Sequence, residues 1–231
     1  VWQDVVLLAT GDVRIGDLHV RTVLPKPDNS LAELTFAVPV INDSDAARVV
    51  EIEARFADII LRQSVTLAPT SGATVQFDPA QFPELRIRNP RLWWPNGYGE
   101  PTLHNLVLTA RVGGAVSDAR TIRFGLREVS YELSAVDRAE ELRRVAVAPA
   151  RSTGEQLLDV AHSDIRKVEG GWAVSLARDV AGSAALAPVA DTSLAPHLLI
   201  RVNGVPIAVR GGNWGMDDWM KRVSRERMEP F

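Results

Sequence analysis

The sequence predicts an all-β protein whose first part is an immunoglobulin-like antiparallel β-sandwich, and three observations support this fold class. Apolar and polar residues alternate with period two through the first half, turn-forming residues separate the alternating runs, and no strong helical pattern lies between them. The chain has 231 residues, whereas such a sandwich needs about 100. A sandwich therefore leaves a large part of the chain to be explained.

The alternating runs give each expected strand one apolar and one polar face, as a strand between a core and water requires. In the run 32–38, Leu34, Phe36 and Val38 share the apolar face. The same pattern recurs in the runs 50–56, 106–110 and 122–127. Val5–Leu8 or Leu18–Val23, together with Thr74–Phe77, bring the total to about seven strands, the number of an immunoglobulin-like sandwich.

Turn chemistry separates these runs. Proline, glycine, asparagine and aspartate gather at residues 25–29, 42–45, 69–72 and 113–114. We therefore assign residues 1–131 to the sandwich.

The pattern changes after residue 131. The charged stretch Asp137–Arg144 is compatible with a short helix, and residues 165–177 predict a hairpin around Gly170-Gly171. Residues 181–196, rich in alanine, serine and proline, predict an irregular loop. We treat residues 132–197 as an insertion or linker that contains a hairpin.

Residues 198–231 predict a second hairpin and the start of a helix. Asn203-Gly204 is a strong two-residue hairpin signal, and Asp217 or Asp218 can cap a helix that runs to Met228. One hairpin and one helix cannot bury a second core, so we expect both ends of the chain to be cuts within a longer protein. Without partner strands, residues 198–219 should be poorly ordered or packed against a neighbouring molecule.

Composition excludes several function classes. The formal net charge is −3, from 26 basic and 29 acidic residues without a basic stripe, which argues against nucleic acid as a partner. The absence of cysteine excludes disulfides and thiolate metal sites. No apolar run approaches the roughly 18 residues of a membrane span. Neither the bacterial cytoplasm, the periplasm nor secretion is excluded.

The sequence shows no motif for a metal, a cofactor or a nucleophile. The four histidines are far apart and lack metal-ligand spacing. There is no Gly-x-Ser-x-Gly motif and no phosphate-binding glycine loop. We therefore expect no cofactor, no bound metal and no catalytic residue within these residues.

The stretch 93–99, Trp-Trp-Pro-Asn-Gly-Tyr-Gly, is the most unusual part of the sandwich. Its aromatic rings could stack on sugar rings. Alternatively, Trp93, Trp94 and Tyr98 pack the sandwich against a neighbouring domain. The second interpretation is favoured, because adjacent residues of a strand point to opposite sides and only one tryptophan can face a ligand.

The stretch 210–218, Arg-Gly-Gly-Asn-Trp-Gly-Met-Asp-Asp, combines three glycines with hydrogen-bonding and aromatic side chains. This mixture suits a polyhydroxylated ligand. A glycine-rich connection with an exposed helix cap explains it equally well.

Two stretches together resemble glycoside hydrolase family 2. Asn-Pro-Arg-Leu-Trp-Trp-Pro-Asn-Gly-Tyr-Gly-Glu-Pro-Thr-Leu at 89–103 resembles the sandwich domain of its β-mannosidase and exo-β-glucosaminidase branch. Leu-Ile-Arg-Val-Asn-Gly-Val-Pro-Ile-Ala-Val-Arg-Gly-Gly-Asn-Trp at 199–214 resembles the entry into that family's catalytic (β/α)8 barrel. Val1–Val5 resembles the exit from its N-terminal jelly roll, whereas residues 135–195 match nothing in this pattern.

The resemblance implies that catalysis lies elsewhere in a longer enzyme. The family cleaves terminal β-sugars by a retaining mechanism that uses two glutamates. Both glutamates lie on later barrel strands, so the resemblance implies that they would follow Phe231. Arg210, Gly211 and Asn213 match the family's Arg-Gly-x-Asn pattern, and Asp217 falls on its acidic position. Gly215 stands where galactosidases and glucuronidases have histidine. An aromatic residue at the position of Trp214 borders the sugar site in the mannosidase-like branch.

Two functions from different classes follow. In the first, the chain is a non-catalytic portion of a family 2 exo-β-glycosidase, its partners are that enzyme's jelly roll and barrel, and Arg210, Asn213, Trp214 and Asp217 contribute to sugar binding. In the second, it is an independent carbohydrate-binding or adhesive immunoglobulin-like module that uses the aromatic residues at 93–98.

Overall fold

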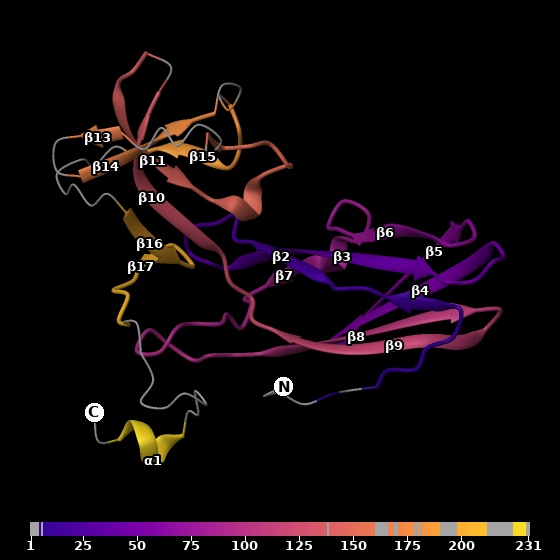
Figure 1. Cartoon of the computed structure of the whole chain (residues 1–231). Helices are drawn as coiled ribbons and strands as arrows, with labels where there is room; N and C mark the ends of the chain where they lie inside the picture. Colours follow the sequence, from indigo (N-terminus) through magenta and orange to yellow (C-terminus); the bar gives the residue numbers. More distant parts are fainter. Residues whose placement is uncertain are drawn as a thin grey trace.

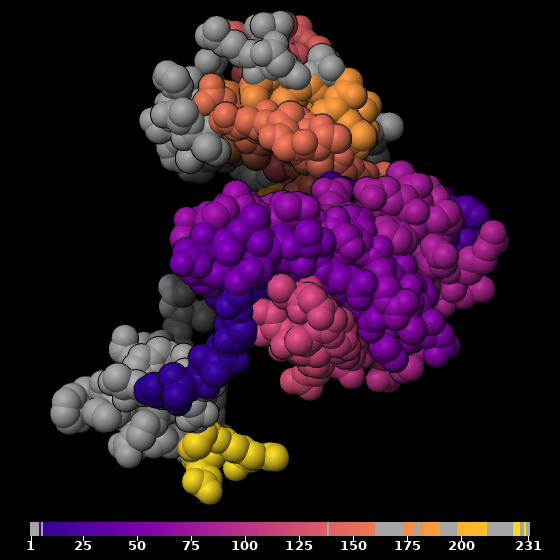
Figure 2. All heavy atoms as spheres, turned by 90° about the vertical axis from the view of Figure 1, so that its right-hand side faces the viewer, coloured from indigo at the N-terminus to yellow at the C-terminus, as the bar shows by residue number. Residues whose placement is uncertain are grey.

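A computed structural model describes residues 5, 7–137, 139–159, 166–168, 171–177, 180, 182–189, 198–211 and 224–229. The strands form three sheets: two sheets of the expected sandwich and a third, C-terminal sheet built from residues 129–206 (Figure 1). In the space-filling view of Figure 2, the orange atoms of the C-terminal sheet lie next to the purple atoms of the sandwich. The described part of the chain is thus predominantly β-structure, as its alternation predicts.

The first sheet of the sandwich has five strands around the long β3 (Leu31–Asn42). β1 (Val13–Ile15), β2 (His19–Val23), β6 (Ser71–Phe77) and β7 (Arg86–Arg88) all pair antiparallel with β3. A 3-10 turn, η1 (Pro83–Leu85), leads into β7. The even-numbered residues of β3 are buried, which gives the sheet one continuous apolar face.

The second sheet has four strands in the order β5 (Ile59–Leu67), β4 (Arg48–Phe56), β8 (His104–Val112) and β9 (Ala115–Phe124). All neighbours are antiparallel. The two inner faces enclose one core, in which Phe36 lies edge-on to Phe56 and Phe124 at ring-centroid distances of 6.1 and 6.2 Å. This confirms the predicted antiparallel sandwich.

The C-terminal sheet is organised around β10 (Val129–Val136), which continues directly from the sandwich (Figure 1). β11 (Leu142–Val147) and β16 (Leu198–Val202) pair antiparallel with it, and β14 (Gly171–Leu176) pairs parallel with its end. The remaining strands are β12 (Leu158–Asp159), β13 (Arg166–Val168), β15 (Leu186–Pro188) and β17 (Val205–Pro206). Its small core of Ala135, Val145 and Val147 is separate from the sandwich core.

Two local expectations are wrong. Asp137–Arg144 is a tight hairpin rather than a helix, because the Asp137 carboxylate accepts hydrogen bonds from the backbone N–H groups of Ala139 and Glu141 at 2.9 and 3.0 Å. Within the predicted loop 181–196, β15 pairs with β11. The sequence analysis did not predict β5, because its residues do not alternate strictly between apolar and polar.

The hairpin expected around Gly170-Gly171 is present as β13 and β14, and the Asn203-Gly204 hairpin as β16 and β17. β16, which we expected to lack partner strands, pairs with β10. The predicted boundary between 197 and 198 therefore falls inside one sheet. The expected helix 217–228 lies mostly outside the described residues; its end is the short helix α1 (Arg225–Met228).

Candidate functional site

The aromatic turn, residues 93–99, is held in place by its backbone. Trp93 forms an isolated bridge with Pro101 and donates its N–H to the Leu126 carbonyl at 2.9 Å. A Cβ atom at Gly125 would lie 2.5 Å from the Trp93 Cβ, so only glycine permits this approach. The turn is therefore fixed against the end of β9.

Neither tryptophan ring of this turn stands free. The Arg127 guanidinium lies 4.4 Å from the centre of the Trp93 ring, a cation–π contact. The Trp94 side chain lies so close to Gly99 that a Cβ there would be 2.8 Å from its Cγ. Both rings are partly buried. This packing uses ring surface that a stacked sugar would need.

The aromatic turn contacts the β16–β17 hairpin and the segment that follows it. The Asn203 side-chain amide donates a hydrogen bond from Nδ2 to the Trp93 carbonyl at 3.0 Å. The Tyr98 hydroxyl accepts a hydrogen bond from the Ala208 backbone N–H at 2.7 Å. These partners are 110 residues apart in sequence. The turn thus connects the sandwich with the chain that leads to Arg210.

We expect Tyr98→Phe to weaken this connection by about 0.5 to 1 kcal/mol of stability, because the exposed N–H of Ala208 can turn to water instead. Hydrogen exchange at the Ala208 amide should accelerate, while the amides of β8 remain unchanged. Unchanged exchange at Ala208 would show that the hydroxyl contact does not order the segment.

A second set of contacts, the junction cluster, surrounds Glu128 between β9 and β10. The Glu128 side chain, 9% exposed, accepts the Leu24 backbone N–H at 2.6 Å and forms an ion pair with Arg151 at 3.0 Å. Arg151 also donates to the Leu24 carbonyl at 2.9 Å. It belongs to the 3-10 turn η2 (Pro149–Arg151), so the cluster ties β2, β10 and η2 together.

Asn203 completes the junction cluster from the hairpin side. Its backbone N–H donates to the Glu128 carbonyl at 2.8 Å, and its Oδ1 accepts the Glu128 N–H at 3.0 Å. Its own carbonyl accepts from the Asn29 side chain at 3.1 Å. Asn203 is 2% exposed and has a φ of 52°, a left-handed conformation that asparagine tolerates better than most residues.

The junction cluster is a part of the site that the sequence analysis missed. A usable signal was present: in the alternation Phe124, Leu126, Glu128, a carboxylate occupies a position on the inward face. A charge at such a position needs a buried partner. The partner itself, Arg151, could not be identified from spacing.

The other buried carboxylates are also occupied. Asp118 accepts the backbone N–H groups of Ile15 and Ala119, both at 2.8 Å. Glu132 lies between two arginines, 2.5 Å from Arg201 and 3.1 Å from Arg144. These bonds give the carboxylates structural roles. General acid–base or nucleophilic catalysis needs a carboxylate that is open to a substrate.

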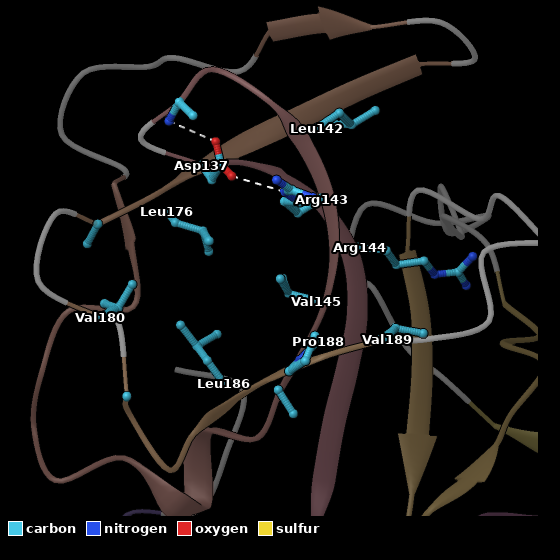
Figure 3. Close-up of a pocket in the computed structure, with 14 residues that line it drawn as sticks. Asp137, Leu142, Arg143, Arg144, Val145, Leu176, Val180, Leu186, Pro188 and Val189 are labelled. Carbon is cyan, nitrogen blue, oxygen red and sulfur yellow. Dashed lines mark hydrogen bonds and ion pairs between the residues drawn. The ribbon is translucent and has the colours of Figure 1, made fainter.

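The C-terminal sheet contains a cavity of about 690 Å³ (Figure 3). Apolar side chains, among them Leu142, Val145 and Leu186, line most of it. At its rim Asp137 pairs with Arg143 at 3.1 Å, and the Glu141 backbone N–H and Arg143 lower the pKa of Asp137. Figure 3 shows the Arg144 side chain directed away from the cavity. Its described lining lacks the convergent polar groups of a catalytic pocket.

Of the four predicted sugar-binding residues, only Arg210 is among the residues that the structure describes. Arg210 is exposed, four residues after β17. Asn213, Trp214 and Asp217 lie outside the described residues. Within the described part of the chain, no three histidine, aspartate or glutamate side chains gather as metal ligands. No helix in that part is both long and apolar enough to cross a membrane.

Comparison with known proteins finds relatives of this chain, chiefly through the sandwich. Residues 13–127 match the family model of glycosyl hydrolases family 2. An exo-β-D-glucosaminidase of Streptomyces avermitilis is 39% identical over 132 residues, 57% of this chain. A mannosylglycoprotein endo-β-mannosidase of Lilium longiflorum is 24% identical over 243 residues, 98% of this chain. The crystal structure of the Amycolatopsis orientalis exo-chitosanase CsxA is 29% identical, covers 60% of this chain and has a TM-score of 0.47.

The chain spans only part of each relative: 15% of the exo-β-D-glucosaminidase, 18% of the endo-β-mannosidase and 15% of the exo-chitosanase chain. The endo-β-mannosidase alignment includes the C-terminal sheet as well as the sandwich. Residues 13–127, which form the sandwich, thus belong to glycosyl hydrolases family 2, and the relatives of the chain are exo-β-D-glucosaminidases and β-mannosidases.

Proposed function

We propose that these 231 residues are a non-catalytic β portion of a longer retaining exo-β-glycosidase that removes terminal β-linked glucosaminyl or mannosyl residues. The observation that carries this is the match to glycosidases over a small share of their length. The occupied carboxylates agree with it. Asp118, Glu128 and Glu132 all bind arginines or backbone N–H groups. On this proposal both catalytic glutamates follow Phe231.

The role of the β portion is to position the chain that enters the catalytic domain. The junction cluster and the aromatic turn hold residues 203–208 against the sandwich through Asn203 and Tyr98. Arg210 follows two residues later. In this proposal, Arg210, Asn213, Trp214 and Asp217 contribute to the floor of the sugar site once the barrel is present.

The test compares two polypeptides: residues 1–231 and the complete protein encoded with them. With p-nitrophenyl β-D-glucosaminide and β-D-mannoside, the complete protein should release nitrophenol and residues 1–231 should not. Measurable turnover by residues 1–231 would contradict the proposal that catalysis lies downstream. A complete protein that is inactive on both aryl glycosides would contradict the exo-glycosidase assignment.

The alternative, an independent sugar-binding module, is tested on the same fragment. Calorimetric titration with glucosamine and mannose oligosaccharides should give no heat that depends on Trp94, because this side chain packs against Gly99. Binding that Trp94→Ala abolishes would favour the binding module instead.

A further inference from the structure

A polar cleft opens between the sandwich and the segment after η2, and we name it the junction cleft. It has a volume of about 460 Å³. It is lined by His19, Arg21, Thr35, Ala37, Gln76, Ser152, Thr153 and Gly154. This lining contains one arginine and one histidine but no carboxylate, and the wholly apolar side chains are limited to Ala37.

Strand pairing explains why these side chains meet. His19 pairs with Ala37 and Arg21 with Thr35 across β2 and β3, while Ala37 pairs with Gln76 across β3 and β6. Paired residues lie on the same face of a sheet, and so do residues two apart along one strand. All five therefore share the outer face of the five-stranded sheet, with the small side chain of Ala37 at the centre.

Thr35 shows that this part of the outer face is covered. Even-numbered residues of β3 point into the core, and Thr35 is the odd-numbered residue that is also buried, at 8% exposure. The cover is the segment after η2, because Arg21 donates to the Ser152 carbonyl at 3.2 Å. Thr35 also belongs to the lining of the cleft, so its hydroxyl can donate to a ligand atom there.

Two carboxylates near the cleft, Asp78 and Glu155, already accept hydrogen bonds. Burial alone would raise the pKa of Asp78, but the backbone N–H groups of Gln81 and Ala80, and more weakly the charge of Arg21, lower it. Glu155 accepts from Ser152, Thr153 and Ser183, and chiefly the Ser183 hydroxyl lowers the pKa of Glu155 to about 2. These bonds fix the wall formed by residues 152–155 and leave the remaining N–H groups of Arg21 available.

From this donor-rich lining we propose that the junction cleft binds an oxyanion group, a carboxylate, phosphate or sulfate, with Arg21 as its charged donor and Thr35 as its buried one. Arginine forms strong, directional hydrogen bonds with such groups. The net charge of the chain is −3, so general attraction of anions to the protein does not account for such binding. This site is independent of the proposed glycosidase function, since it uses no residue of the predicted sugar site.

The experiment is calorimetric titration of the 231-residue protein with sodium phosphate, sodium sulfate, sodium glucuronate and uncharged glucose, at constant ionic strength. We expect saturable binding of at least one anion and none of glucose. A preference for glucuronate over both inorganic ions identifies an anionic saccharide as the ligand class. Equal or stronger binding of phosphate or sulfate identifies a free or esterified inorganic oxyanion.

Three variants locate the binding. Arg21→Gln should weaken it about tenfold or more, because it removes the charged donor. Thr35→Val removes the hydroxyl at nearly constant volume, and Ala37→Leu fills the centre of the cleft. Arg123→Gln, an exposed arginine of β9 in the other sheet, is the matched control and should bind like wild type. The proposal is overturned if no anion binds, if glucose binds as well as the anions, or if a well-folded Ala37→Leu protein binds unchanged.

Discussion

Asn203→Ala is expected to lower the free energy of unfolding by about 3 to 5 kcal/mol. The substitution removes a buried hydrogen bond from the Glu128 N–H and a partly buried one to the Trp93 carbonyl, and both backbone groups lose this partner. It also places alanine at a φ of 52°, a left-handed conformation that alanine adopts less readily than asparagine. Urea unfolding followed by far-UV circular dichroism measures the change.

Two further variants separate these contributions. Glycine adopts the left-handed backbone conformation readily but has no side chain to form the hydrogen bonds. Asn203→Gly should therefore recover only the part of the lost stability that comes from the backbone conformation. Asn89 has a φ of 47° and an exposed side chain, so Asn89→Ala measures the backbone strain by itself. If Asn203→Ala and Asn89→Ala are equally destabilising, the side-chain bonds of Asn203 contribute nothing.

Glu128→Ala should cost about 2 to 4 kcal/mol. It leaves the buried Leu24 N–H without its acceptor and Arg151 without its ion-pair partner. The Leu24 N–H stays buried without an acceptor, which accounts for most of the cost, whereas the Arg151 side chain is 38% exposed and can turn partly to water. The measurement is the same urea unfolding experiment, with Glu51→Ala, an exposed glutamate of β4, as the control.

The separate roles of Glu128 can be measured with Glu128→Gln, which keeps an acceptor for Leu24 and removes the charge. A double-mutant cycle with Arg151→Ala then gives the coupling energy of the ion pair. A coupling energy near zero would assign the stability contribution of Glu128 to the Leu24 bond alone. A loss with Glu128→Ala no larger than with Glu51→Ala would contradict the junction cluster as a stabilising element.

The sandwich could be predicted from the sequence because its strands have one face toward solvent and one face toward the core. Leu34, Phe36 and Val38, which share the predicted apolar face, are all 0% exposed. β5 was missed because Ile60 lies on its exposed face and Gln63 on the opposite face, which breaks the alternation of apolar and polar residues in the sequence. The hairpin at Asp137 was mistaken for a helix, because the charges that fix its turn also suit an exposed helical surface.

The junction cluster could not be predicted because its partners are far apart in sequence. Leu24 and Glu128 are 104 residues apart, and Asn29 and Asn203 are 174 apart. A pattern within a short window carries no information on such pairs. The aromatic turn was noticed for its composition. Its contacts with Asn203 and Ala208 required the structure.

The same separations bear on the order in which the chain folds. Every strand of the sandwich ends by Phe124, so the sandwich can close while later residues are still being synthesised. Asn203 can contact Asn29, Trp93 and Glu128 only after the C-terminal sheet has brought it back to them. Contacts of such long range form late in folding, because closing the long intervening loop costs conformational entropy. We therefore expect Asn203 to join a sandwich that has already formed, and substitutions there to act mainly by speeding up unfolding.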